Sequence, residues 1–243
     1  MPELSLLMIF IGFLLGAISA LTGTGGSIFA IPLLMLGFNM TLNQAAPIAL
    51  LAVVSASSIA VIQGLRAGMV RYKTALLMAA FGIAFAPLGV WLAKQIPAQI
   101  LNLFFAVILV YVAFQMWQQS TKTLLADENK LTPPCIINPA TSKLFWTALC
   151  TRRLIFTGSI AGMLSGLLGV GGGFVIVPSL LKVSNFNMQT IIATSLAVVA
   201  LVSTTTVLTH AFNGDIQWKI ALPFMIGTML GMASFRLISF KIT

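Results

Sequence analysis

Apolar segments as long as a membrane-spanning helix recur throughout this 243-residue sequence. A transmembrane helix needs about 20 apolar residues. Full-length runs of this kind lie at 4–22, 43–65, 74–94, 98–118, 188–212 and 218–240. Only 7% of the residues are charged, whereas a soluble domain carries about 25%. The sequence therefore excludes a soluble domain and predicts an all-α polytopic membrane protein. Since Glu3 and no basic residue precedes the first run, we expect a membrane segment there rather than a cleaved signal.

Glycine-rich loops interrupt two of the apolar segments. The loop Gly23-Thr24-Gly25-Gly26 precedes a short run at 27–38, and the loop at 169–173 separates 154–168 from another short run at 174–183. These short runs reach roughly 15 to 18 Å as helix, about half of the 30 Å hydrocarbon core. We expect each broken segment to be a re-entrant hairpin or a tilted pair. A segment that crosses the membrane once is the alternative.

The sequence repeats after 146 positions without a gap. Glycine, proline, serine and lysine residues stay in step, which chance apolar similarity does not produce. The pairs include Gly12 with Gly158, Gly16 with Gly162, Ser19 with Ser165, Gly25 with Gly171, Pro32 with Pro178, Ser57 with Ser203 and Lys73 with Lys219. We expect a first membrane repeat at 1–118, a linker at 119–153 and a second repeat at 154–243, forming one transport unit. Two related halves are typical of transporters. Re-entrant hairpins favour an inverted arrangement, and a parallel arrangement stays open.

Basic residues gather in two loops that the crossing count places on the same face. Arg66, Arg71 and Lys73 form one group, and five Lys or Arg residues lie between Lys122 and Arg153. Cytoplasmic loops carry an excess of Lys and Arg, so we expect the linker to be cytoplasmic. The net charge of +9 is an orientation signal, and we expect the lipid bilayer rather than nucleic acid as the partner.

The sequence offers little material for enzyme chemistry. Two cysteines, Cys135 and Cys150, make no disulfide framework and no metal set, and there is one histidine. The predicted spans contain no paired carboxylates, catalytic triad or metal cluster. We therefore expect no enzyme, no catalytic residue, no metal and no cofactor.

The two glycine loops are the predicted anion site. Consecutive glycines turn sharply and present backbone N–H groups, and a helix that begins directly afterwards adds its positive dipole end. The candidate residues are Thr24, Gly25, Gly26, Ser27, Gly171, Gly172 and Gly173. The alternative is that these glycines only permit close helix packing. That packing role is what we expect of the small-xxx-small pairs Gly12 with Gly16, Gly158 with Gly162 and Gly166, and Gly227 with Gly231.

A polar stripe follows the run that ends at His210. At 100° per residue, Ser195, Ser203, Thr206 and His210 fall within about 80° of one another. We add Thr194, Ser195, Ser203 and His210 to the candidate substrate-binding residues. The alternative for the hydroxyls, which we prefer for Thr204 and Thr205, is a bond to the preceding helical turn. The alternative for His210 is a water-exposed interface histidine.

Two copies of a G-x-G-G motif followed by proline resemble the TauE/SafE sulfite exporter family. The copies run from Gly23 to Pro32 and from Gly169 to Pro178, and Ala193-Thr194-Ser195-Leu196 is a further matching patch. The resemblance implies a bacterial inner-membrane permease for sulfite, sulfoacetate or related sulfur-containing anions. The first copy departs from the pattern at Ser27, at 47–49 and at Gly64, which aligns with His210. Two unequal half-sites follow from these departures.

No carboxylate lies deep within a predicted span. Proton and sodium symporters usually place an acidic residue there. An inside-negative potential supplies about 2.3 kcal/mol per charge per 100 mV and expels anions without a coupling ion. We therefore predict an anion exporter, with a proton- or cation-coupled uptake permease for an organic sulfur compound as the alternative. The sequence leaves open which anion is carried and whether the chain forms a homodimer.

Overall fold

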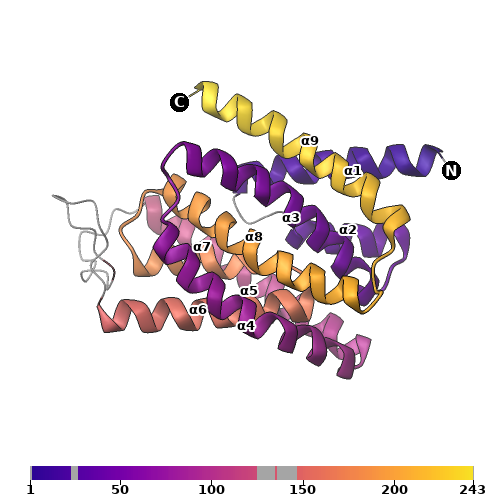
Figure 1. Ribbon diagram of the computed structural model, residues 1–243, viewed down its shortest axis with the longest axis horizontal. Helices are drawn as coiled ribbons and strands as arrows, with labels where there is room; N and C mark the ends of the chain where they lie inside the picture. Colours follow the sequence, from indigo (N-terminus) through magenta and orange to yellow (C-terminus); the bar gives the residue numbers. More distant parts are fainter. Residues whose placement is uncertain (1, 23–26, 125–134, 136–146, 243) are drawn as a thin grey trace.

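In the part of the chain that the structure describes, helices joined by short connections make up the fold (Figure 1). The computed structural model describes residues 2–22, 27–124, 135 and 147–242. The helices are α1 (Pro2–Thr22), α2 (Ser27–Phe38), α3 (Leu42–Arg66), α4 (Tyr72–Gln95), α5 (Ala98–Leu124), α6 (Ala148–Leu168), α7 (Gly173–Val183), α8 (Met188–Phe212) and α9 (Trp218–Ile242). The all-α prediction is confirmed for these residues.

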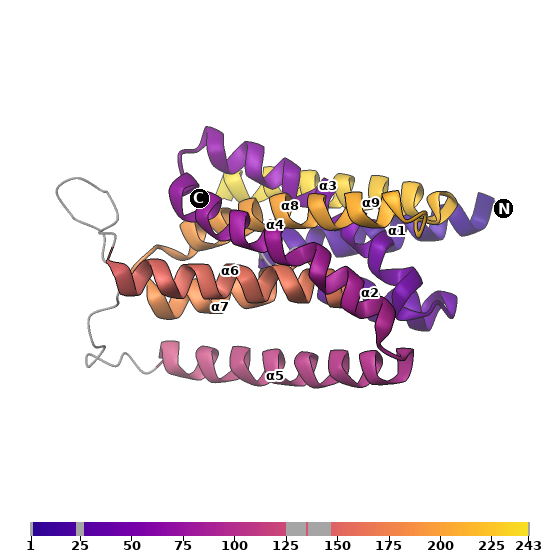
Figure 2. The same cartoon turned by 60° about the horizontal axis from the view of Figure 1, so that its bottom comes forward.

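Five of these helices are long and apolar enough to cross a membrane, namely α3, α4, α5, α8 and α9. Helices α3 and α8 are largely buried and contact each other at the centre of the bundle. Helix α5 is mostly exposed and lies along one side of the bundle (Figure 2). The shorter apolar helices α2 and α7 follow the two glycine loops. The polytopic prediction is consistent with these five candidate spans.

Helices extend into the predicted linker, 119–153, from both of its ends. Helix α5 continues to Leu124, and α6 already begins at Ala148. Thr147 supplies the reason for the second boundary, because its side chain accepts a hydrogen bond from the Cys150 N–H at 3.2 Å and caps the helix. The exposed Arg152 and Arg153 therefore stand on the first turns of α6.

Glycines bring two pairs of helices into backbone contact. On α1, a Cβ at Gly12 would lie 2.5 Å from the Phe224 carbonyl oxygen of α9. On α6, a Cβ at Gly158 would lie 2.5 Å from the Met78 carbonyl oxygen of α4. One turn further on, Gly16 and Gly162 make the corresponding contacts with Thr228 of α9 and Gly82 of α4. The predicted packing role of these glycines, and of Gly166, Gly227 and Gly231, is confirmed.

The helix that opens each half packs on the helix that closes the other half. Helix α1 lies beside α9, and α6 lies beside α4 (Figures 1 and 2). In both pairs the residue numbers rise together along the interface, so the two helices of each pair run in the same direction. Neither half therefore completes its own packing.

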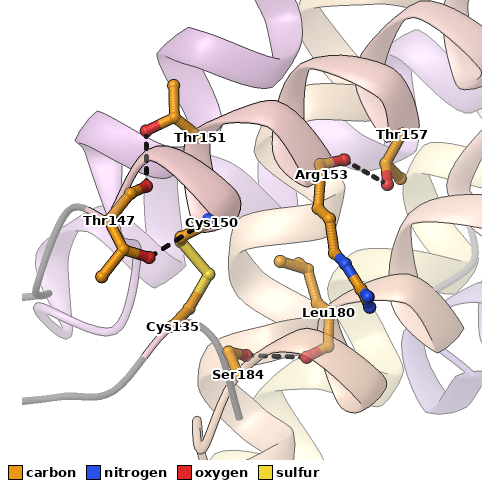
Figure 3. The surroundings of a disulfide bond; sticks show 8 residues. All are labelled: Cys135, Thr147, Cys150, Thr151, Arg153, Thr157, Leu180 and Ser184. Atoms are coloured by element: carbon orange, nitrogen blue, oxygen red, sulfur yellow. Dashed lines mark hydrogen bonds between the residues drawn. A yellow bond between two sulfur atoms is a disulfide. The ribbon is translucent and has the colours of Figure 1, made fainter.

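Helices α6 and α7 form a hairpin whose two ends meet. Cys150, near the start of α6, is disulfide-bonded to Cys135 (Figure 3). The Cys135 N–H donates to the Val183 carbonyl oxygen at 3.1 Å, where α7 ends. We call this the linker end of the bundle. It includes the loop between α3 and α4, since the Arg71 N–H donates to Thr194 Oγ1 at 3.2 Å near the start of α8. The opposite end, where α4 and α8 finish, is the Lys94 end.

The disulfide corrects one sequence expectation. Cys135 and Cys150 lie 15 positions apart, with their Cα atoms 5.3 Å apart, and both side chains are buried. Two cysteines are too few to indicate a framework. Their pairing depends on the position of Cys135 against the end of α7, which composition does not reveal.

Candidate functional site

The loop between α6 and α7 consists of a turn that only glycine adopts readily. Gly169, Gly171 and Gly172 have φ angles of +73°, +72° and +72°, in the left-handed region that other L-residues avoid. The Gly169 N–H donates to the Ser165 carbonyl oxygen at 2.9 Å and ends α6. Packing also requires glycine here, because a Cβ at Gly172 would clash with the Ala161 carbonyl oxygen, 2.7 Å away.

Helix α7 begins inside the bundle and directs its first N–H groups at this loop. The Val175 and Ile176 N–H groups donate to the Gly172 carbonyl oxygen at 3.1 and 3.3 Å, as the first bonds of the helix. The preceding N–H groups, of Gly173 and Phe174, have no acceptor within a helix that starts at Gly173. Both residues are buried. A buried helix N-terminus with unsatisfied donors and a positive dipole end favours an anion.

Two buried serine hydroxyls lie close to this loop. Ser203 of α8 is 0% exposed, and its Oγ lies 3.1 Å from where a Cβ at Gly171 would be. Ser165 of α6 is also 0% exposed, one turn before Gly169. Neither hydroxyl has a hydrogen-bond partner within the described part of the chain. Since nearly all buried polar groups in proteins are paired, these hydroxyls are available to a ligand.

The buried face of α8 continues from Ser203 toward the Lys94 end. Ser203, Thr206 and His210 follow one another at helical spacing and are 0%, 0% and 7% exposed. Thr206 Oγ1 donates to the Val202 carbonyl oxygen at 3.0 Å. The predicted alternative for Thr204 and Thr205 is confirmed, because they donate to Ala200 and Leu201 one turn earlier.

Three charged or titratable side chains meet at the Lys94 end. Lys94 Nζ, at the end of α4, lies 2.9 Å from Asp215 Oδ2, and His210 Nδ1 lies 3.2 Å from the same oxygen. Burial alone would raise the pKa of the Asp215 carboxyl. The hydrogen bonds from Lys94 and His210, with the charges of both groups, outweigh burial and hold this pKa below its ordinary value. Asp215 is therefore an anion that accepts bonds from two separate helices.

The profile of the family described as "Sulfite exporter TauE/SafE" matches residues 8–241. The chain belongs to the TauE/SafE family. It is similar to a "Probable membrane transporter protein" of Xylella fastidiosa, with 30% identity over 225 residues that cover 91% of this chain and 78% of the relative. It is also similar to the "Probable membrane transporter protein YunE" of Bacillus subtilis, with 22% identity covering 93% of this chain and 85% of the relative.

An archaeal "Probable membrane transporter protein", from Methanocaldococcus jannaschii, is 26% identical over 204 residues, covering 81% of this chain and 68% of the relative. No solved structure matches the chain. The family and these relatives indicate a membrane transporter, and the five candidate spans indicate a multi-pass membrane protein.

Some of the residues predicted to form the TauE/SafE site lie elsewhere or outside the described structure. Thr24, Gly25 and Gly26 lie outside the described residues, and Ser27 begins α2 with a side chain that is not described. Thr194 and Ser195 stand at the linker end of α8. Thr194 accepts from the Arg71 N–H, and Ser195 Oγ donates to the Ile192 carbonyl oxygen at 2.9 Å. Nine residues of helix, or roughly 13 Å, separate Thr194 from Ser203.

The structure adds three residues that the sequence did not single out for a role. Ser165 had one signal, its pairing with Ser19 in the repeat. Asp215 had one signal as well, because Gly214-Asp215-Ile216 after His210 resembles the TauE/SafE family, although no role was assigned to it. Lys94 had none, because it is far from Asp215 in the sequence and meets it only through the packing of α4 near the end of α8. Among the described residues, no three His, Cys, Asp or Glu side chains come together as a possible metal site.

Proposed function

We propose that this TauE/SafE transporter exports sulfite or a small sulfonate anion across a bacterial inner membrane. The anion is held between the two glycine-loop tips by backbone N–H groups and serine hydroxyls. The observation that carries the proposal is the buried start of α7 beside Ser203, whose Oγ has no partner among the described residues and lies 3.1 Å from the Cβ position of Gly171.

The donor set supports an oxyanion over a cation. The N–H groups of Gly173 and Phe174 can only donate, and the hydroxyls of Ser165 and Ser203 are able to donate as well. Sulfite and sulfonate groups offer several oxygen acceptors in a compact arrangement, which suits donors supplied by a helix terminus and by neighbouring helices. Buried dipoles bind such an anion without a fixed charge that would hold it too tightly for release.

We also propose that the two halves of the chain are inverted repeats. Helices α3 and α8 are equivalent by the shift of 146 positions. Helix α8 begins at the linker end, where the loop after α3 contacts it through Arg71 and Thr194. Equivalent helices that run in opposite directions support inversion. The equivalent glycine contacts, α1 on α9 and α6 on α4, support it further.

We propose that the linker end faces the cytoplasm. Arg66, Arg71, Lys73, Arg152, Arg153 and Lys182 stand at the linker end, against Lys94 and Lys219 at the opposite end. This excess follows the positive-inside rule. The Cys135–Cys150 disulfide weighs against this orientation, because disulfides are rare in the reducing cytosol.

Labelling distinguishes the two orientations. In a Cys135→Ser/Cys150→Ser background, a membrane-impermeant maleimide added to intact spheroplasts is expected to label Asn213→Cys and not Ala67→Cys, both exposed loop positions at opposite ends. The reverse pattern would overturn the proposed orientation.

The proposed driving force is the membrane potential. Asp215, the carboxylate whose side chain the structure describes, lies in the loop after α8 and not within a span. An inside-negative potential contributes about 2.3 kcal/mol per charge per 100 mV toward expelling an anion. A span without a carboxylate supports export without a coupling cation. The buried His210 favours the second candidate, proton-coupled uptake of an organic sulfur compound.

Flux measurements in proteoliposomes test the function and the site together. Sulfite efflux is expected to follow an imposed potential, and Ser203→Ala is expected to reduce it by about tenfold through the loss of one hydrogen bond to a charged ligand. Thr204→Val is the matched control on the same helix, because its hydroxyl bonds only to the preceding turn. Efflux that ignores the potential but follows a pH gradient would support the uptake candidate instead. Equal flux in Ser203→Ala and Thr204→Val would overturn the loop site.

A further inference from the structure

Lys94 and His210 converge on a single oxygen atom of Asp215. Lys94 Nζ is 2.9 Å and His210 Nδ1 is 3.2 Å from Asp215 Oδ2. An ionised carboxylate only accepts hydrogen bonds, so both nitrogen atoms act as donors. The two donors come from different halves of the chain, Lys94 from α4 and His210 from α8. We call these three side chains the Lys94 latch.

Two donors that meet on one oxygen form an anion-binding arrangement whose occupant is the protein's own carboxylate. A sulfite or sulfonate oxygen makes the same demand on its surroundings as a carboxylate oxygen, since both accept charge-assisted hydrogen bonds from ammonium and imidazole N–H groups. Asp215 therefore occupies the position that an oxyanion would take between Lys94 and His210.

The latch is placed between water and the buried polar face of α8. The side-chain exposure falls from 45% at Lys94 through 28% at Asp215 to 9% at His210. His210 Nε2 is buried and has no hydrogen-bond partner within the described part of the chain. His210 stands two helical turns, roughly 10 Å, beyond Ser203 on the same face. An anion that leaves Ser203 along this face passes Thr206 and reaches His210 before the other two side chains of the latch.

We propose that the Lys94 latch is a second anion-binding site and the gate at this mouth of the transport path. This proposal rests on the proposed function. The arriving oxyanion displaces the Asp215 carboxylate from Lys94 and His210. That exchange releases the loop after α8 from α4, which separates the two halves at this end and opens the path to water. When the anion leaves, Asp215 returns and the mouth closes.

The first half lacks this device at the opposite mouth. By the 146-position shift, Gly64 corresponds to His210, Met69 to Asp215 and Phe240 to Lys94. A gate that responds to an anion therefore exists at one end of the molecule. The two ends of the transport path therefore respond differently to the anion. This distinguishes the end at which the anion enters from the end at which it leaves, although the two halves of the chain are repeats.

Two variants that are expected to change sulfite affinity in opposite directions test the latch. Sulfite binding is measured by calorimetry on the purified full-length protein in a Ser203→Ala background, which weakens the glycine-loop site. Asp215→Asn removes the competing charge and is expected to tighten sulfite binding about three- to tenfold. Lys94→Gln removes a donor and is expected to weaken binding to a similar extent. Lys219→Gln, which removes an exposed positive charge at the same end, is the matched control and is expected to bind as the background does.

A merely structural role predicts a different result. If the three side chains only join α4 to the loop, Asp215→Asn and Lys94→Gln lower the unfolding temperature together and leave sulfite affinity at the control value. That outcome, or weaker binding in both variants, overturns the latch.

Hydrogen–deuterium exchange tests the latch in the unmodified protein, so the result does not depend on whether a variant folds. Sodium sulfite is expected to raise hydrogen–deuterium exchange at 213–217, relative to sodium chloride of equal ionic strength. Unchanged exchange overturns the latch. Failure of the glycine-loop site is separate, because it appears as unaltered flux in Ser203→Ala while Asp215→Asn still gains affinity.

Discussion

Ser203 and Gly171 define the proposed site at the scale of single residues. A buried hydroxyl without a partner costs about 1–3 kcal/mol, and the cost is recovered when a ligand accepts its hydrogen bond. Ser203 Oγ is in this state beside the left-handed Gly171. Gly171 has no side chain, so no Cβ occupies the position 3.1 Å from this hydroxyl. The two residues are therefore expected to act as a pair.

Gly171→Ala is expected to abolish most transport, and Gly68→Ala is its matched control. Both glycines have left-handed φ angles, +72° and +66°, so both alanine variants are expected to lose about 1–2 kcal/mol of stability. Only at Gly171 does the new Cβ approach other groups, at 3.1 Å from Ser203 Oγ and at 3.2 and 3.3 Å from methyl groups of Val53 and Val199, whereas Gly68 has nothing within 4 Å. We expect sulfite flux per folded molecule to fall about tenfold in Gly171→Ala alone. Equal flux in the two variants would show that the space beside Ser203 is not used.

At the scale of helices, close backbone contact holds the helices together in place of the hydrophobic effect. Lipid tails are as apolar as leucine, so helices in a bilayer associate through packing and need small residues at their contacts. Gly162 meets the Gly82 backbone of α4, and Gly16 meets the Thr228 backbone of α9. No larger residue fits at these contacts while the helices keep their separation.

Gly162→Ala is expected to destabilise the protein, although alanine favours helices. The added Cβ would collide with the Gly82 backbone, and overpacking costs about 1–3 kcal/mol. We expect the unfolding temperature in detergent to fall by about 5–10 °C. The control is Gly37→Ala on α2, where nothing lies within 4 Å of the added Cβ and helix propensity alone adds about 1 kcal/mol of stability. A fall of similar size in both variants would contradict the packing argument.

The sequence predicts the helices well because their length and hydropathy are local properties. The run at 43–65 becomes α3, Leu42–Arg66, and the loop at 169–173 breaks α6 from α7 as its glycines indicate. The edges of the linker were less predictable, since the start of α6 depends on the Thr147 cap, a single side-chain bond. Ser203 was a candidate from the polar stripe of its helix. That its hydroxyl has no hydrogen-bond partner among the described residues depends on the side chains around it in three dimensions.

At the scale of the whole molecule, the Lys94–Asp215 ion pair joins the two halves. The sequence did not predict this contact, because it depends on where α4 and the end of α8 lie relative to each other. The Cys135–Cys150 pair, which lies within the predicted linker, was missed because it depends on the position of Cys135 against the end of α7. Contacts between halves are set by the packing of whole helices, which a linear pattern does not encode.

The stability of the protein is expected to fall in acid through Asp215. Because Lys94 and His210 hold the pKa of its carboxyl below the ordinary value, the folded state binds this proton less readily than the unfolded state. The stabilisation is therefore complete above the ordinary aspartate pKa of about 3.9 and is lost as pH falls through the lower, folded value. Thermal unfolding followed from pH 6 down to pH 2 measures the loss. Asp215→Asn is expected to show a smaller decline, and parallel curves would contradict the assignment.

The pairing of α1 with α9 also has a consequence for biosynthesis. Of the described helices, α1 leaves the ribosome first and α9 last, yet Gly12 and Gly16 find their partners only at Phe224 and Thr228. At 5–20 residues per second, roughly 10 to 40 seconds of translation separate the two surfaces. During that interval the glycine face of α1 lies in the bilayer without its partner. Assembly therefore cannot proceed half by half, because the close contacts of α1 form only once α9 has been inserted.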